Sequence, residues 1–124
     1  MKTVRPTRKR ASSRAEWAAR TVAWARDGLD LSADEIGAAV GAAGRTVARW
    51  AKRSAAPQPS HRARIEKLDE LKYLLDAVFR DREAAQEWLY TPVPVLRGRT
   101  PHALLREGRL DEIIGELEIG RAHV

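Results

Sequence analysis

The chain has 124 residues, no cysteine and a formal net charge of +6, which permits one compact domain or two small lobes and excludes disulfides and thiolate metal sites. Helix-forming Ala, Leu, Arg and Glu are plentiful and strand formers are scarce, so the composition predicts an all-α fold. No apolar run is long enough to span a bilayer and none follows the basic amino end as in a secretory signal, so we expect a cytoplasmic protein with no membrane partner.

The charge is unevenly divided along the chain. Residues 1–64 contain 14 Lys and Arg against 5 Asp and Glu, a net charge of +9, whereas residues 65–124 contain 9 against 12, a net charge of −3. A basic half joined to a mildly acidic half predicts two surfaces that bind different partners. We expect the basic surface to bind a polyanion.

The amino end is expected to be an arm followed by a helix. Residues 1–12 begin with MKTVRPTRKR, a basic stretch of low apolar content that is typical of a disordered segment. Such an arm can follow phosphates or enter a minor groove if a DNA-binding element comes after it. Ser13 and Glu16 form a capping box that predicts a helix start at Ser13, and Gly28 predicts the end of that helix.

The next two predicted helices have the pattern of a helix-turn-helix. Ser32 opens a short helix with another S-x-x-E capping box, and Gly41 supplies the turn before a helix over residues 44–53. Gly37 is the small residue that is needed where two helices cross closely. The positions that this motif buries are all apolar: Ile36, Val40, Ala42, Val47 and Trp50.

The predicted third helix presents one basic face. With Val47 and Trp50 turned inward, the cations lie on the opposite face, as they do in a recognition helix of the major groove. Arg45 and Arg49 are candidates for bidentate bonds to guanine, and phosphate contacts are expected from the others. The candidate DNA-binding residues are Arg45, Thr46, Arg49, Lys52 and Arg53. A solvated basic face is the alternative. Because one half-site is seldom enough, we also expect a homodimer whose recognition helices lie about 34 Å apart.

The rest of the sequence predicts a series of helices separated by prolines. A connector containing Pro57 and Pro59 biases its residues away from helix before the long apolar periodicity that follows. Helices are predicted over residues 60–80, 82–90, 101–108 and from 111 onward. The expected organisation is an arm over residues 1–12, a helix-turn-helix domain over 13–76 and a small helical lobe over 77–124.

An ordered series of residues begins at Glu87 and reads EWLYTPVPVLRGRTPHALLREGRLDEIIGELE. Its markers are Trp88-Leu89, Pro92, Leu96, Gly98, Pro101, Leu104-Leu105 and Gly108, followed by an apolar last helix. This series resembles the Xre/MbcA/ParS type antitoxins, which are partners of RES-domain toxins. The first half agrees through RTVARW and its proline-containing connector, so the resemblance covers the chain from about Ser13 to Glu118.

The resemblance implies an antitoxin that represses its own operon through the amino-terminal helices. It implies that the carboxyl-terminal lobe neutralises a RES toxin, an enzyme that consumes NAD or transfers its ADP-ribose, and that the chain itself is no enzyme. We expect no cofactor, and no metal site because the sequence contains no visible cluster of metal ligands. We expect the exposed parts of the last two helices to contact the toxin. Arg97 and Arg99 are expected to pair with toxin carboxylates, with a solvated loop as the alternative. The candidate toxin-binding residues are Arg97, Arg99, Pro101, Leu104, Leu105, Ile113, Ile114 and Leu117.

The pattern of the family fails after Glu118. The sequence IGRAHV at residues 119–124 is also the translation of ATCGGAAGAGCACACGTC, a common sequencing-adapter sequence, so we expect these residues to be non-native. A genuine polar tail is the alternative. In the family the extreme carboxyl terminus helps close the active-site cleft of the toxin. A chain without that segment is expected to bind toxin yet inhibit it poorly.

Two other functions fit part of the pattern. One is a free-standing helix-turn-helix transcription regulator whose carboxyl-terminal half mediates dimerisation, and the other is an interaction adaptor whose helix-turn-helix no longer binds DNA. A neighbouring RES reading frame would separate the antitoxin from the regulator, and DNA binding would separate it from the adaptor. An enzyme is disfavoured, because His61, His102 and His123 are dispersed and the sequence has no P-loop or dinucleotide fingerprint.

Overall fold

The described part of the chain is built from helices. A computed structural model describes residues 8–122, with side chains described for residues 13–120. Its elements are α1 (Arg8–Leu29), α2 (Ala33–Val40), α3 (Gly44–Ala51), α4 (Pro59–Val78), α5 (Arg82–Leu89), the 3-10 helix η1 (Pro94–Leu96), α6 (Pro101–Arg106) and α7 (Leu110–Ala122). Over these residues the β interactions amount to one isolated bridge between Val93 and Arg99, so the predicted all-α fold is confirmed.

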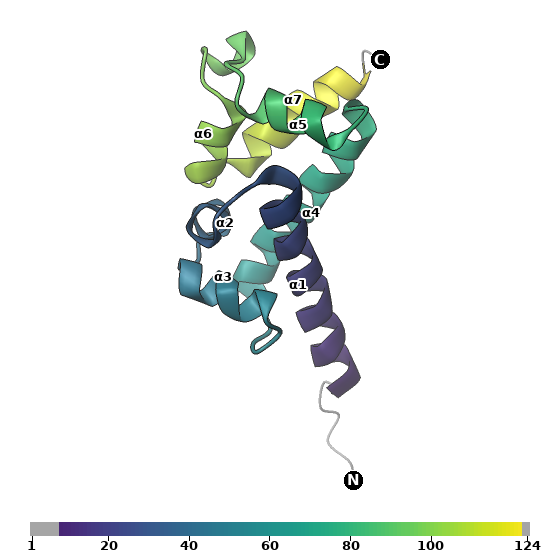
Figure 1. The fold of residues 1–124 in the computed structure, drawn as a ribbon, viewed down its shortest axis with the longest axis vertical. Coiled ribbons are helices and arrows are strands. Elements are labelled where there is room, and N and C mark those ends of the chain that lie inside the picture. Colours follow the sequence, from purple (N-terminus) through teal and green to yellow (C-terminus); the bar gives the residue numbers. More distant parts are fainter. Residues whose placement is uncertain (1–7, 123–124) are drawn as a thin grey trace.

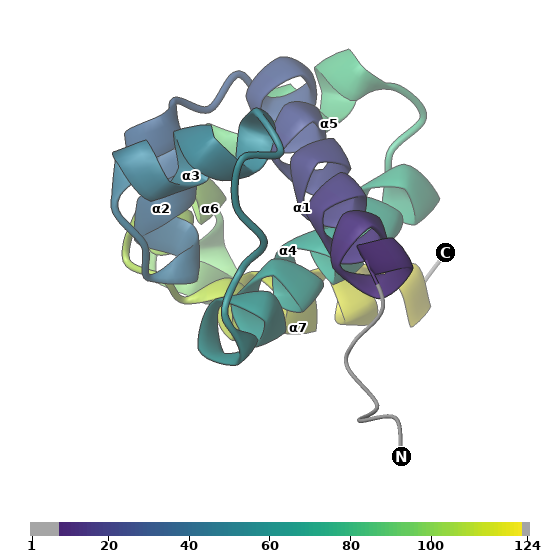
Figure 2. The ribbon, with the colours of Figure 1, turned by 90° about the horizontal axis from the view of Figure 1, so that it is seen from below.

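The helices form two groups around α1 and α4. Figure 1 shows α2 and α3 beside α1, while α5, α6 and α7 gather at the end of the molecule that lies away from the amino terminus. The view along the long axis shows how α1 contacts α3, α4 and α5 (Figure 2). None of the described helices combines the length and the apolar character needed to cross a membrane.

The first helix is longer than the sequence pattern predicted. It begins at Arg8 rather than at Ser13, because Arg, Lys and Ala are good helix formers and no breaker stands between Arg8 and Ser13. The start predicted from the capping box at Ser13 is therefore wrong, and residues 8–12 of the expected arm are helical. Residues 1–7 of that arm lie outside the described residues.

The end of α1 also differs from the prediction. Gly28 lies inside the helix, and the left-handed conformation falls on Asp30, with φ 57°. The backbone N–H of Leu31 then donates to the carbonyl of Ala25 over 3.3 Å. The short polar side chain of Asp tolerates this conformation, which is why the helix can end without using its glycine.

The helix-turn-helix follows the sequence signals closely. The side chain of Ser32 accepts from the N–H of Glu35 over 3.1 Å, and Glu35 Oε1 accepts from the N–H of Ser32 over 3.0 Å, so the second capping box is present. Gly41 adopts φ 75° and ends α2. A Cβ at Gly37 would lie 2.3 Å from the carbonyl oxygen of Ala42, so this position requires glycine. The turn is therefore built as predicted.

The later helices agree with the prediction to within a few residues. The first turn of α4 holds Pro59, and that of α6 holds Pro101 behind the Thr100 cap, whose hydroxyl accepts from the N–H of Ala103 over 3.1 Å. The long helix α4 ends at Val78, and α7 starts at Leu110 and continues past Glu118 to Ala122. Residues 119–122 thus extend the last helix.

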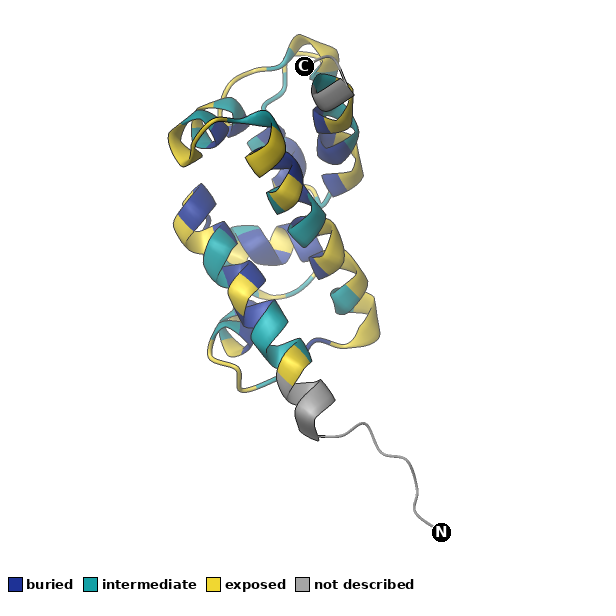
Figure 3. Ribbon diagram, turned by 90° about the vertical axis from the view of Figure 1, so that its right-hand side faces the viewer, coloured by how far each residue is buried: buried dark blue, intermediate teal, exposed yellow. Residues whose placement is uncertain are grey.

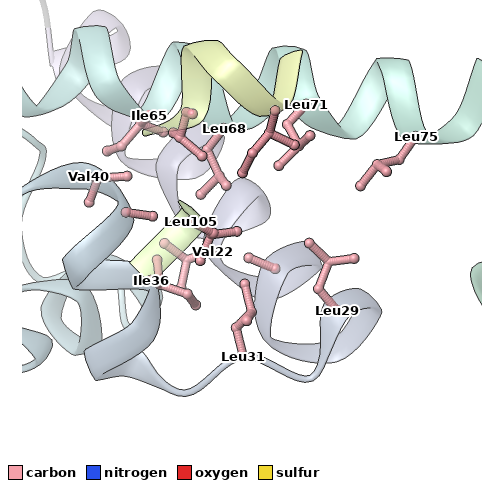
Figure 4. Packing of buried hydrophobic residues seen from close by; sticks show 14 of the residues in the cluster. Val22, Leu29, Leu31, Ile36, Val40, Ile65, Leu68, Leu71, Leu75 and Leu105 are labelled. Carbon is pink, nitrogen blue, oxygen red and sulfur yellow. The ribbon is translucent and has the colours of Figure 1, made fainter. Parts of the chain in front are cut away.

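One hydrophobic core joins the two expected domains. Figure 3 shows buried and exposed residues alternating along the described parts of the α-helices. Leu105 of α6 belongs to the same cluster as Val22 of α1, Ile36 of α2 and Leu68 of α4 (Figure 4). The expected boundary at residues 76 and 77 falls inside α4, which contributes to both groups of helices.

Candidate DNA-binding face and toxin-binding lobe

The helix α3 is held by its apolar side. Val47 and Trp50 are each 1% exposed and belong to the core. The ring of Trp50 makes an edge-to-face contact with His61 near the start of α4, with 5.4 Å between the ring centroids. Ile36 and Val40 of α2 are buried as predicted, and Ala42 in the turn is half-buried. Burial of these residues fixes the rotation of α3 about its own axis.

The opposite side of α3 carries free cations. Arg45, Arg49 and Lys52 are exposed, and their side chains form no hydrogen bond or ion pair with any other residue in the described part of the chain. Their donors are therefore available to an external anion or base edge. Guanidinium groups suit both, since they can form paired hydrogen bonds with a phosphate or with the major-groove edge of guanine.

The other two candidate DNA-binding residues differ from this group. Thr46 is half-buried on the flank of α3. Arg53 follows the helix with φ 59°, and its guanidinium donates to the carboxylate of Glu16 on α1. Because Glu16 offsets part of the charge of Arg53, we expect the phosphate affinity of this arginine to be lower than that of Lys52.

An acidic residue that the sequence pattern did not single out lies at the amino end of α3. A Cβ at Gly44 would lie 2.0 Å from Oδ1 of Asp34, so the carboxylate of α2 rests directly on the first residue of α3. The N-cap of α3 is Ala43, whose side chain cannot cap the helix. A negative charge is stabilised near a helix amino end. In the sequence, the acidic first turn of α2 is the only sign of this contact. That Asp34 lies against Gly44 depends on how α2 and α3 cross, which the sequence does not give.

The apolar residues proposed from sequence for toxin binding are inside the protein. This corrects the prediction that they contribute contact atoms, because a side chain buried by its own core cannot reach a partner. The faces of α6 and α7 that remain exposed carry other residues, among them Arg106 and Glu118. The buried members of the predicted set are Pro101, Leu104, Leu105, Ile113, Ile114 and Leu117.

The two arginines of the predicted set have different surroundings. Arg99 donates two hydrogen bonds to the carboxylate of Glu107, over 2.9 and 2.8 Å. This guanidinium beside Glu107 lowers the pKa of that carboxyl below its usual value. Arg97 is exposed and its guanidinium has no partner among the described residues. The guanidinium of Arg97 is therefore open to an external carboxylate, whereas that of Arg99 is already paired within the chain. The pairing of either arginine with a toxin stays a prediction.

A polar contact ties the lobe to the helix-turn-helix. Nε2 of His102 on α6 contacts Oε2 of Glu35 on α2, and the ring of Tyr90 lies on the His102 ring with 4.6 Å between their centroids. The hydrogen bond from the backbone of Ser32, helped by His102, lowers the pKa of Glu35 below its usual 4.5. Burial raises the pKa of Tyr90, and the nearby carboxylates of Glu35 and Asp30 add to this effect.

The charge of Glu35 is expected to stabilise the fold in a way that depends on pH. A carboxyl whose pKa is lower in the folded state contributes stability above its unfolded pKa and loses it as the pH falls through the folded value. Glu35→Gln keeps a side chain that can complete the capping box but removes the charge. We expect the variant to have a lower free energy of unfolding at neutral pH, and the difference from the unaltered chain to shrink below pH 4.5.

Urea unfolding between about pH 7 and pH 3 measures this difference. Glu83→Gln is the matched control, because Glu83 is an exposed acid in the first turn of α5. A difference that stays constant over the whole pH range would contradict the role assigned to the Glu35 charge.

The comparisons with known proteins agree with this arrangement. A family described as the antitoxin Xre/MbcA/ParS C-terminal toxin-binding domain matches residues 74–118. The mycobacterial cidal antitoxins MbcA of Mycobacterium bovis and Mycobacterium tuberculosis are each 33% identical to this chain over 102 residues, which cover 81% of this chain and 88% of the relative.

A solved structure extends the similarity to three dimensions. The crystal structure of the M. tuberculosis MbcT–MbcA toxin–antitoxin complex contains a chain that matches with a TM-score of 0.63 and 30% identity, over 86% of this chain and 95% of that chain. The sequence and structural matches both cover most of the chain. The chain therefore belongs to the Xre/MbcA/ParS family of antitoxins.

Proposed function

We propose that this chain is the antitoxin of a RES-domain toxin, one that consumes NAD or transfers its ADP-ribose, and that it neutralises this toxin by binding it in the cytoplasm. The observation that carries the proposal is the similarity, over most of both chains, to MbcA, an antitoxin that is found in a complex with MbcT. The match to the toxin-binding domain supports the location, because residues 74–118 contain α5, η1 and α6 entirely and most of α7.

Co-expression with the RES-domain protein of the neighbouring reading frame tests the proposal. We expect induction of that protein alone to arrest growth, and induction together with this chain to yield a complex that copurifies. Growth should be restored fully if residues 119–124 are native, and only in part if they replace the segment that closes the active-site cleft of the toxin. The free-standing regulator predicts no rescue and no complex. Continued growth arrest with both proteins present in the soluble fraction, and without a complex, would contradict the proposed function.

We further propose that α3 binds the operator of the same operon. Arg45 and Arg49 would bond to base edges, while Thr46, Lys52 and Arg53 would contact phosphates, with the contribution of Arg53 reduced by Glu16. The free cations on the outward side of α3 support this assignment. Repression would require two copies of the chain on one face of the DNA, with recognition helices about 34 Å apart, hence a homodimer.

A further inference from the structure

The segment from Val93 to Arg99, here called the tip loop, is held in one shape by its own backbone. The N–H of Val93 donates to the carbonyl of Arg99 over 3.1 Å. The carbonyl of Val93 accepts from the N–H groups of Leu96 and Gly98 over 2.9 and 3.0 Å. Prolines at positions 92 and 94 fix further dihedral angles. The tip loop is therefore rigid before it meets any partner.

The conformation at Arg97 is unusual for its residue type. Arg97 has φ 61° and the following Gly98 has φ 76°, so two consecutive residues are left-handed. A residue with a Cβ is strained in this region, and glycine is the residue that adopts it without strain. Strain of this kind is concentrated at functional sites. The sequence nevertheless places a long cationic side chain at this point, and its guanidinium forms no hydrogen bond or ion pair with the described residues.

Interactions behind the tip loop hold it against the lobe. Leu96 packs on the core, and Arg99 forms its paired hydrogen bonds with Glu107. Arg109 links Glu107 to Glu112, with N–O distances of 3.4 Å to Glu107 and 2.6 Å to Glu112. These residues support the loop from the side of the lobe. On the opposite, outer side of the loop, Val95 and Arg97 are exposed.

The outer side of the tip loop combines an apolar and a cationic group. Val95 is 70% exposed. Val95 and Arg97 also line a hollow of about 340 Å³ whose wall includes Arg109 and Glu112. The pattern suits a partner that presents an aliphatic side chain next to an Asp or Glu carboxylate. Residues 65–124 as a whole are acidic, and the guanidinium of Arg97 places a positive charge on this side of the loop.

We propose that Val95 and Arg97 anchor the toxin on the tip loop. This inference rests on the proposed function and adds the docking surface to it: the toxin places an apolar side chain against Val95 and a carboxylate against Arg97. A rigid loop loses little conformational freedom on binding. Arginines that become desolvated and paired at the centre of an interface are frequent hot spots. Arg99 and Glu107 take part as internal supports of the loop.

The substitution Arg97→Gly separates contact from folding. Glycine relieves the left-handed strain, so the midpoint of thermal unfolding is expected to stay the same or rise, while loss of the guanidinium weakens toxin binding about tenfold or more. Arg97→Glu is expected to weaken binding further through repulsion of the toxin carboxylate. Val95→Ser is expected to weaken binding about tenfold through loss of the apolar contact.

The measurement is titration calorimetry of each purified antitoxin variant with the RES-domain protein encoded beside it. Arg82→Glu is the matched control, since Arg82 is an exposed arginine at the start of α5 whose side chain has no partner among the described residues. We expect the control to bind like the unaltered chain and Arg97→Gly to retain operator binding.

The outcomes distinguish the two proposals. If the unaltered chain does not bind the toxin, the proposed function fails and this surface with it. If the unaltered chain binds and all three tip-loop variants bind equally well, or if Arg82→Glu weakens binding as much as Arg97→Glu, the proposed function stands and the tip-loop anchor is wrong.

Discussion

The double substitution Arg45→Ala and Arg49→Ala is expected to weaken operator binding by at least about 30-fold. A bidentate arginine–guanine contact contributes about 1–3 kcal/mol of discrimination, so two such contacts contribute about 2–6 kcal/mol. The fold should be unaffected, because both side chains are exposed and form no hydrogen bond or ion pair within the described residues. Toxin binding should also be retained, since the tip loop lies on other elements of the molecule.

Fluorescence anisotropy with DNA from upstream of the operon, at one fixed salt concentration, measures this loss. Arg80→Ala with Arg82→Ala is the control, because it removes the same charge from two exposed arginines, one just before α5 and one at its start. Operator affinity of the unaltered chain should fall steeply with salt, and Lys52→Ala should reduce the slope of log affinity against log salt by about 1. Equal affinities of the α3 variant and the control variant would contradict α3 as the recognition helix.

The substitution Gly37→Ala is expected to lower the free energy of unfolding by at least about 3 kcal/mol, the upper end of the usual cost of overpacking. The added Cβ would lie 2.3 Å from the carbonyl oxygen and 3.3 Å from the carbonyl carbon of Ala42. These are backbone atoms of the turn, and the N–H of Ala42 already donates to the carbonyl of Gly37 over 2.9 Å. The turn cannot move away without breaking that hydrogen bond and displacing α3.

The control for this prediction is Gly115→Ala in α7, where a Cβ would meet no atom within 4 Å. Alanine is the better helix former, so this variant should gain about 0.5–1 kcal/mol. Urea unfolding followed by circular dichroism compares the two variants. Equal free energies of unfolding for the two variants would contradict the close crossing of α2 and α3 at Gly37.

The helix-turn-helix could be predicted because its signals are local. A capping box at Ser32, glycines at positions 37 and 41 and the apolar side of α3 each act within a few residues, and each is present in the structure. The reliance on local signals also explains why the start of α1 was predicted wrongly. The capping box at Ser13 is a valid local signal, but propensity carries the helix back to Arg8.

The surfaces of the lobe could not be predicted in this way, because they depend on contacts between distant residues. An apolar residue at helical spacing serves equally as core or as interface, and only the packing of α6 on α2 and α7 shows that Leu104 and Leu105 are core. The pairing of Arg99 with Glu107 and of Glu35 with His102 likewise requires the folded chain. Arg97 and Arg99 look equivalent in sequence and are not equivalent in the structure.

Because the two groups of helices share one core, the proposed toxin binding and the proposed DNA binding should be lost together when the chain is degraded. A protease that cut the chain after α5 would remove Leu105, Ile113 and Ile114 from the cluster that also contains Ile36 of α2 and Leu68 of α4. The fragment left behind would lose apolar cover on the very helices that position α3. Degradation that frees the toxin would therefore also relieve repression, so that replacement antitoxin is transcribed without any separate signal.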